Sequence, residues 1–545
     1  MSFLKPRNRH LKHGSNSHSC VLQKSSKRDR FKKSLLVFLF LNIFWLIFRT
    51  GTKPSRIVYP CQRAALRNIS IAVGTLVPLL TFSLIGSNNK RQWLAKGKTF
   101  LIVFLIIAPV TSGIIIQKTT SYTEAGLEIT PFLSDADFSS DIFVVNGPEV
   151  AHIEDLFELM GTNGLLFYQS PTSDLTQGPA GLIAPDDVVL IKNNCQWSER
   201  GGTNTDLIYE LIQIILDHPD GFTGEIVIAD NGQGRGRMNW GRANAEDHSQ
   251  SAQTVANNFS SLGHDVSTYL WDTIKNREVD EYSDGDNQDG YVVFDSADPE
   301  SGIYVSYPKF NTTFGTSISF KNGIWNGTDY EQKLKIINMP VLKTHSGFGV
   351  TAAMKHYMGV QSQGVANGHQ TIATGSMGTL MAELGIPTLN ILDAIWINAN
   401  PAPSIGNGPS TGYGDATRVN IIMASLDPIA LDYWAAKHIL LQAAILTEET
   451  GTHTISPDNT LRSGLEEAFG VWLNLSKSEL LLAGYNVTSN ESEMNIFANS
   501  LVVDIGVAPT GGRIWLWVGI GSSIGVIAIV ATVLTISTIR KKKKM

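Results

Sequence analysis

Cysteine is scarce in this chain. Its 545 residues include only Cys20, Cys61 and Cys195, which lie far apart. Three separated cysteines exclude a disulfide framework and a four-cysteine zinc or iron–sulfur site within one chain, so no iron–sulfur cluster is expected. Charged residues make up only 17% of the sequence against 43% hydrophobic residues. This composition excludes a disordered or coiled-coil chain.

Acidic residues are almost absent from both ends of the chain. Residues 1–33 hold ten Lys or Arg and a single acid, and residues 34–116 hold nine Lys or Arg and no acid. Residues 117–513 hold 48 Asp or Glu against 19 Lys or Arg. A protein that binds nucleic acid needs a basic surface to neutralise phosphates. The sequence therefore predicts no nucleic-acid partner for this acidic section.

Four apolar runs carry no charge. They cover residues 34–48, 69–86, 99–116 and 514–539. The last is the longest, with Trp515 and Trp517 at one end and the basic run 540–544 at the other, and this is typical of a transmembrane helix. The second and third are shorter but still long enough to cross a bilayer, and they are predicted to span as well. The first is the shortest and is predicted to be a short uncleaved span. The lipid bilayer is thus an expected partner.

The basic residues beside these runs predict their orientation. If all four runs span, residues 1–33, 88–98 and 540–545 share one side and carry 19 Lys or Arg, whereas residues 49–67 on the other side carry five. Basic flanks favour the cytoplasmic side. We therefore predict a multi-pass protein of the cell membrane whose large domain is extracytoplasmic.

The same patterns predict how the chain is divided. We expect the following parts in order: a basic cytoplasmic tail (1–33), three hydrophobic membrane segments (34–116), a linker and entry region (117–185), an α/β domain (186–484) with a loop-rich insertion (272–326), a membrane-proximal segment (485–513), a transmembrane helix (514–539) and a basic cytoplasmic tail (540–545).

Short β-branched runs alternate with amphipathic stretches from Asp186 onward. The first five elements are predicted as strand 188–192, helix 206–217, strand 225–230, helix 249–262 and strand 265–271. Later ones are strands 335–342, 387–394 and 420–425, helices 350–358 and 428–442, and a late helix with a Ser476/Glu479 capping box that ends at Gly484. This order predicts an α/β fold with a mostly parallel sheet and helices on both faces, plus transmembrane helices at both ends of the chain.

Polar residues follow several of the predicted strands. One strand ends in Lys192 and the next in Asp230, while Lys343-Thr344-His345 and Asp393 end two others. Ligands of open parallel sheets bind beyond the carboxyl ends of the strands. These residues are therefore expected to border a site.

Several separated motifs in this region resemble one known family. They are Thr203-Asn204-Thr205-Asp206, the run 338–345, the run 351–359, Asp393 with Gly406-Asn407-Gly408-Pro409, and the run 425–432. Over residues 186–484 the chain resembles the proteins grouped as domain of unknown function 362. Some members of that family carry iron–sulfur modules, which the cysteines of this chain do not supply. His356 stands where the family pattern usually has Asn.

Lysine and histidine gather in one part of an otherwise acidic section. We predict Lys343, His345, Lys355, His369 and Asp393 as catalytic residues, with the lysines stabilising negative charge and a histidine moving a proton. His345 and His369 are also candidate ligands of a divalent metal. The alternative is that the lysines pair with nearby acids and that the histidines are ordinary surface groups.

Two further stretches are candidates for holding a cofactor or an anion. Asp230 and the loop with Gly234, Arg235 and Gly236 offer backbone N–H groups and guanidinium forks to a phosphate or carboxylate, and the alternative is a plain surface loop. Thr203 and Asn204 are expected at the start of a helix. The N-terminus of this helix is predicted to face the same phosphate or carboxylate, and the alternative is that the two residues only cap the helix. Asp427 is interpreted as a helix cap, and residues 284–290 as a solvated acidic loop in preference to a calcium loop.

Two classes of function fit these residues. The leading hypothesis is a membrane-anchored enzyme that acts on a small anionic substrate, with or without assistance from a metal. The alternative is a non-catalytic extracytoplasmic receptor or scaffold that binds a ligand in the same pocket. A redox-complex subunit is disfavoured by the missing cysteines.

The predicted orientation can be tested by proteolysis. Protease added outside sealed, right-side-out vesicles should digest residues 117–513, because the basic flanks place them outside. Immunoblots with antibodies against the acidic section follow the digestion, and detergent-opened vesicles provide the control. Full protection of this section in sealed vesicles would contradict the orientation.

Overall fold

A computed structural model describes most of the acidic section. The described residues are 126–146, 153–366, 368–401, 409–447, 449, 451–460, 468–498 and 502–504, with a few positions between 34 and 68. The chain divides into a unit of residues 123–507 and a second unit made of both ends. Apart from those few positions, the four predicted membrane spans lie outside the described residues. Within the described part of the chain, no helix has the length and apolar character that crossing a bilayer requires.

A central sheet organises the unit of residues 123–507. Its strands lie in the order β18-β2-β17-β16-β13-β5-β6-β7, and β14 and β15 extend it beside β16. The bounds in that order are Met494–Ala498, Ser140–Asn146, Thr417–Ser425, Leu389–Asn398, Leu334–Asn338, Val188–Lys192, Glu225–Asp230 and Val266–Leu270, then Val341–His345 for β14 and Gly349–Thr351 for β15. The neighbours from β16 to β7 pair in parallel, whereas β17 is antiparallel to β16 and β2. The predicted α/β class with a largely parallel sheet is confirmed.

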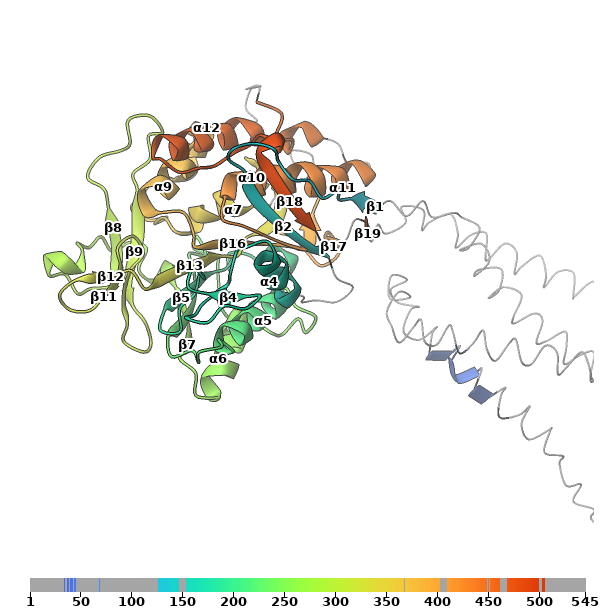
Figure 1. Cartoon of the computed structure of the whole chain (residues 1–545), viewed down its shortest axis with the longest axis horizontal. Helices are drawn as coiled ribbons and strands as arrows, with labels where there is room; N and C mark the ends of the chain where they lie inside the picture. Colours follow the sequence, from blue (N-terminus) through green and yellow to red (C-terminus); the bar gives the residue numbers. More distant parts are fainter. Residues whose placement is uncertain are drawn as a thin grey trace, which may run out of the picture. The chain divides into compact units, whose positions relative to one another are not determined.

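Both faces of this sheet are covered by helices. Successive strand residues point to opposite faces, so Val189 and Ile191 of β5 join one core cluster and Leu190 joins the other. Helices α4 (Ile153–Thr162), α5 (Thr205–Leu216) and α6 (Ala252–Ser261) pack on the first face. The second face is covered by α7 (Ala353–His356), α9 (Ser376–Leu384), α10 (Pro428–Trp434), α11 (Leu441–Leu446) and α12 (Phe469–Leu482), as Figure 1 shows.

Polar caps explain where two of these helices begin. The Asn204 side chain accepts the N–H groups of Asp206 and Leu207, and α5 starts at the next residue, Thr205. Asp427 caps α10 in the same way, with Pro428 in the first turn as its sequence predicts. The predicted helix 428–442 continues beyond α10 as a π-helical segment, Ala435–Leu440, and then as α11.

The predicted capping box of the late helix is wrong. Helix α12 begins at Phe469, so Ser476 lies inside it and its hydroxyl donates to the carbonyl of Gly375 over 3.2 Å. The helix extends further toward the N-terminus because Phe469 and Trp472 are buried in the core. Its end agrees with the sequence, since Gly484 follows in the left-handed conformation with a φ of 88°.

The predicted strand 335–342 is broken at Met339 and Pro340. Proline has no N–H for the ladder, and β13 ends at Asn338 before it. Strand β14 then pairs further along β16, with Val341 opposite Asp393. The break carries Lys343 and His345 beyond the end of β13.

Three segments contain more regular structure than their sequence predicts. The segment 272–326, expected to be rich in loops, contributes most of an antiparallel sheet in the order β12-β11-β10-β9-β8. Its strands are Tyr330–Glu331, Gly323–Trp325, Ser317–Ser319, Ser306–Asn311 and Gly290–Val293. The expected linker 117–185 and membrane-proximal segment 485–513 supply β2 and β18 to the central sheet. The α/β unit is therefore larger than residues 186–484.

The acidic loop 284–290 lies against a lysine of the same sheet. The buried Lys309 donates to the Asp286 carbonyl and lies 4.0 Å from its carboxylate. Asp289 accepts from Asn311 and from the Tyr269 hydroxyl. The carboxylates of Asp286 and Asp289 thus contact groups of the protein itself, although the sequence predicts a solvated loop.

The wider boundaries can be tested by expression of two segments. Residues 123–507 should give a soluble protein that unfolds cooperatively in urea. Residues 186–484 should aggregate, because removing β2 leaves β17 with an unpaired, apolar edge. Gel filtration and circular dichroism check both. Equal solubility and cooperativity of the shorter segment would contradict the assignment of β2 and β18.

Candidate functional site

The site begins at the carboxyl ends of two neighbouring strands. In the parallel register of β5 and β6, Lys192 lies opposite Ala229, so Asp230 is the next residue along. The Lys192 ammonium donates to the Asp230 carboxylate over 2.7 Å, and both side chains are buried. The other carboxylate oxygen accepts the N–H of Cys195 over 2.8 Å. Burial lowers the pKa of Lys192, and the Asp230 carboxylate opposes this shift.

Strand order places this pair at a reversal of the chain's path. From β5 the chain adds β6 and β7 on one side, and later adds β13 and β16 on the other. Crevices at such points are where ligands of open α/β sheets bind. The residues after β13 and β14 therefore meet Lys192 and Asp230 at one edge of the sheet.

Two side chains of β14 reach this edge. Lys343 is fully buried, and its ammonium donates to the carbonyl of Gly201. Burial, together with the nearby Lys355, lowers the pKa of Lys343 to about 7. The Nδ1 atom of His345 accepts the N–H of Gly347 over 3.1 Å. Burial and then Lys355 hold the pKa of His345 well below its ordinary value, so this ring is neutral and its proton lies on Nε2.

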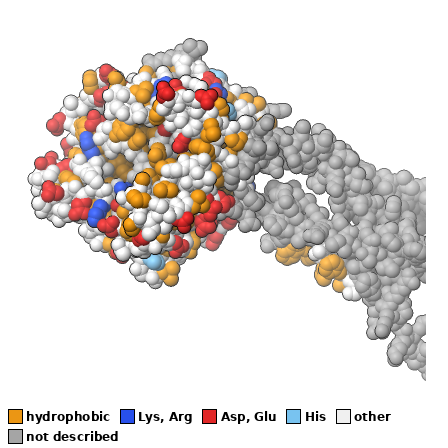
Figure 2. All heavy atoms as spheres, viewed as in Figure 1, with side chains coloured by type: hydrophobic (Ala, Val, Ile, Leu, Met, Phe, Trp, Pro, Cys, Tyr) orange, Lys and Arg blue, Asp and Glu red, His pale blue; other side chains and the backbone are white. Residues whose placement is uncertain are grey.

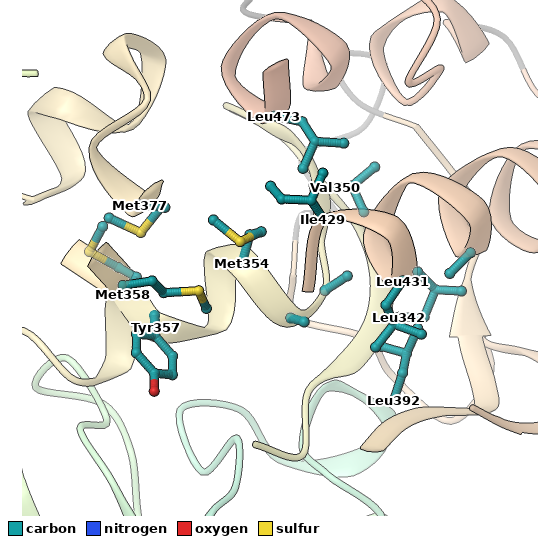
Figure 3. Close-up of a cluster of buried hydrophobic side chains, with 14 of the residues drawn as sticks. Leu342, Val350, Met354, Tyr357, Met358, Met377, Leu392, Ile429, Leu431 and Leu473 are labelled. Carbon is teal, nitrogen blue, oxygen red and sulfur yellow. The ribbon is translucent and has the colours of Figure 1, made fainter. Parts of the chain in front are cut away.

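Helix α7 presents Lys355 to the same edge. The carboxylate of Asp432 fixes the start of α7 by accepting the N–H groups of Ala353 and Met354 over 2.6 and 2.9 Å. Met354 and Met358 are four residues apart and pack together in the core (Figure 3). Lys355 directly follows Met354 but lines the pocket, as Met358 also does, and is only 6% exposed.

The ammonium of Lys355 stands apart from the other two. It lies 5.4 Å from the ring centre of Phe348, and among the described residues no hydrogen-bond acceptor or carboxylate contacts it. Burial alone lowers its pKa to about 8. Lys355 is thus a buried amine without a counter-charge.

Two further histidines lie at the site. His369, from α8 (Gly368–Thr371), has Nδ1 3.0 Å from Oε1 of Gln363. Because that oxygen only accepts, the proton lies on Nδ1 and Nε2 is left as a base. Burial and then Lys355 lower the pKa of His369 to about 4. His356 is bound through Nδ1 to Oδ1 of Asn338 over 2.7 Å.

These side chains line one pocket of about 480 Å³. Its charged and histidine lining residues are Lys192, Arg235, Lys343, Lys355, His345, His356, His369 and Asp230. Asp230 is the one carboxylate among the described lining residues, and it is already bound to Lys192. The face of the molecule in Figure 2 shows many acidic and few basic side chains. The pocket therefore concentrates positive charge within an acidic protein.

Three of the predicted site residues hold the frame of the site without lining the pocket. The buried Asp393 carboxylate accepts the N–H groups of Asn204 and Ile395 over 2.8 and 3.1 Å, and burial raises its pKa to about 6. The Thr203 hydroxyl donates to the carbonyl of Met339 over 2.8 Å. With Asn204 capping α5, these contacts join the start of α5 to β13 and β16.

The glycine-rich loop after β6 does not offer the backbone cradle that its sequence suggests. The N–H groups of residues 233–237 are all taken, by Asn231, Asp272, Gly232 and the carbonyl of Cys195. Gly234 and Gly236 are absent from the described lining of the pocket. Arg235 does line it, and its guanidinium lies 5.2 Å from the ring centre of Trp197. The loop thus contributes a side chain instead of backbone donors.

Metal binding by His345 and His369 stays a prediction. Within the described residues, no three His, Cys, Asp or Glu side chains come together as ligands of one ion. Three neighbouring ammonium groups also oppose a cation there. The donor set fits an anion better than a metal.

The sequence places Lys192 at a strand end that borders the site but gives it no role, and it does not assign Thr351 to the site. Lys192 ends a predicted strand, and so does Asp230, but their pairing depends on the register of two strands that are 38 residues apart in sequence. Thr351 also lines the pocket, and its buried hydroxyl has no hydrogen-bond partner among the described residues. The sequence signal for Lys192 is a lysine at the end of one predicted strand and an aspartate at the end of the next.

Comparisons with known proteins agree with one part of the sequence analysis. Residues 328–437 match the model of a family described as "Domain of unknown function (DUF362)". This segment contains Lys343, His345, Lys355, His369 and Asp393. The resemblance is thereby confirmed for these residues. Neither the curated proteins nor the solved structures gave a match.

The unpaired charge of Lys355 predicts a stability that depends on pH. In the fold this amine loses its proton near pH 8, but in the unfolded chain only near pH 10.5, so stability rises between these values and the full penalty applies below pH 8. Without an anion, Lys355→Met should raise the free energy of unfolding at pH 7 by up to ~3 kcal/mol, at ~1.4 kcal/mol per unit of pKa. Urea unfolding of Lys355→Met and of the wild type, at pH 7 and at pH 10, measures the difference between their free energies of unfolding. This difference should be smaller at pH 10.

The matched control is Lys321→Met. Lys321 is a more exposed lysine, 3.3 Å from Glu383, and its replacement should change stability by less than about 0.5 kcal/mol at either pH. A Lys355→Met protein less stable than the wild type at both pH values would show that the lysine is a structural requirement of the fold.

Proposed function

We propose that the pocket binds a small anion and that the α/β unit is an enzyme acting on it. The observation that carries this proposal is the burial of Lys192, Lys343 and Lys355 around one pocket with a single, already paired carboxylate. Burying an ammonium group without a partner costs several kcal/mol. Proteins retain such a cost mainly where a ligand supplies the missing charge.

Neutral histidines in the same pocket favour catalysis over binding alone. His345 presents an N–H donor and His369 an unprotonated nitrogen. A hydrogen-bond donor and an unprotonated nitrogen beside a bound anion can stabilise developing charge and carry a proton during a reaction. A metal is not required for this chemistry, and a divalent ion bound by the two histidines remains a separate proposal.

The site of action that we propose is the outer surface of the cell membrane. Support comes from the four apolar runs and from the basic residues beside them. The bilayer is then the partner that holds the acidic unit in place, and its substrate is expected to be extracytoplasmic.

Anion binding can be measured by calorimetry with full-length protein in detergent micelles. Inorganic phosphate and sulfate should bind at pH 7, and glycerol should not. Lys343→Met and Lys355→Met should each weaken binding about 10-fold or more, because a hydrogen bond to a charged group contributes about 1.5–3 kcal/mol. Lys321→Met, a lysine outside the pocket, should bind as the wild type does.

Catalysis is tested separately with a panel of phosphate monoesters and carboxylates. His369→Gln should lower turnover about 100-fold or more while anion binding persists, because a positioned acid or base contributes about 10²–10⁴. Anion binding without turnover of any compound would favour the receptor alternative. No anion binding by the folded wild-type protein would refute the proposal.

A further inference from the structure

The three buried lysines of the pocket differ in what holds them. Lys192 is paired with Asp230, and Lys343 donates to the carbonyl of Gly201. Lys355 has neither kind of partner among the described residues, and only the ring of Phe348 lies below its ammonium. Among the described residues, it is therefore the one lysine nitrogen of the pocket without a hydrogen-bond acceptor or a carboxylate.

An amine in such surroundings is a nucleophile. Removal from water favours the neutral form of Lys355, which carries the lone pair. Lys343 is close enough for its own pKa to be lowered by Lys355. With a pKa of about 8, a much larger share of Lys355 is unprotonated at neutral pH than of an ordinary lysine.

We propose that Lys355 forms an imine with the carbonyl carbon of a small anionic aldehyde or ketone bound in the pocket. This inference rests on the proposed function, because Lys343 and Arg235 would hold the anionic group of the same molecule. A pocket of about 480 Å³ is large enough for such a compound.

The reaction balances without an oxidant or reductant. The lone pair of Nζ attacks the carbonyl carbon, a nitrogen–carbon bond forms, and the carbonyl oxygen takes up a proton. The carbon–oxygen bond then breaks, and the oxygen leaves as water after gaining a second proton. The amine gives up two protons in total, so the products are one imine and one water.

The two histidines match two needs of this reaction: a hydrogen bond to the carbonyl oxygen, and a carrier for the protons that move from nitrogen to oxygen. His345 has its proton on Nε2, because its Nδ1 accepts from Gly347, and is thus a donor to the carbonyl oxygen. His369 has its proton on Nδ1, which donates to Gln363, and its Nε2 can accept a proton from the amine. Lys355, His345 and His369 all line the pocket.

Reductive trapping tests this proposal with full-length protein. Glyoxylate, a small aldehyde with a carboxylate, is added with sodium cyanoborohydride at pH 7, and the modified lysine is identified by peptide mass mapping. Lys355 should be modified about tenfold faster or more than Lys321 and Lys333, which are more exposed. Inorganic phosphate should slow the modification of Lys355 only.

A variant gives an independent check. Lys355→Arg keeps the charge and removes the primary amine, so the selective modification should be lost, whereas Lys321→Arg should retain it. If Lys355→Arg does not fold, the peptide mass map of the wild-type protein still shows which lysine forms the imine. Modification centred on Lys343, or spread equally over all lysines, would overturn the proposal.

The failure of this inference can be told apart from that of anion binding. Phosphate binding without glyoxylate is measured on the same preparation. If phosphate binds and no modification at Lys355 follows, the imine proposal alone is refuted. If phosphate does not bind either, the anion site itself is refuted.

Discussion

Unpaired positive charge buried at one edge of the sheet is the constraint on which this site depends. Taking an ammonium group out of water costs several kcal/mol, and the pocket contains three such groups with one carboxylate. The rest of the unit has to supply the stability that these groups remove. It does so with apolar clusters on both faces of the central sheet, which surround the strands that carry Lys192 and Lys343.

The arrangement of the backbone follows from a few local features. The break at Pro340 lets β14 continue past the end of β13, so Lys343 and His345 extend over the ends of the parallel strands. Asp432 holds the first turn of α7, and this sets the position of Lys355. Asp393, which the sequence suggests as a catalytic carboxylate, likewise binds backbone N–H groups. Asp230 is the carboxylate of the described pocket lining, and it pairs with Lys192.

Sequence predicts this molecule well where the signal is local. Strand Glu225–Asp230 has the predicted bounds, and the Asn204 cap starts α5 one residue before the predicted position. Prediction fails where partners are distant in sequence. Strand β2 pairs with β17 and β18, which both come much later in the chain, after most of the other strands of the sheet. The N–H of Gly234 in the glycine-rich loop is likewise taken by Asp272, which no local pattern reveals. The meeting of Lys192, Lys343 and His345 was nevertheless predictable, because the ends of parallel strands lie at one edge of the sheet.

The location of a bound anion is the most direct test of this account. Crystals of residues 123–507 grown with selenate give an anomalous signal that marks the anion independently of the protein density. The account predicts a peak within hydrogen-bonding distance of the Nζ atoms of Lys343 and Lys355. Selenate found only at exposed lysines such as Lys333, with this pocket empty at saturating concentration, would contradict it.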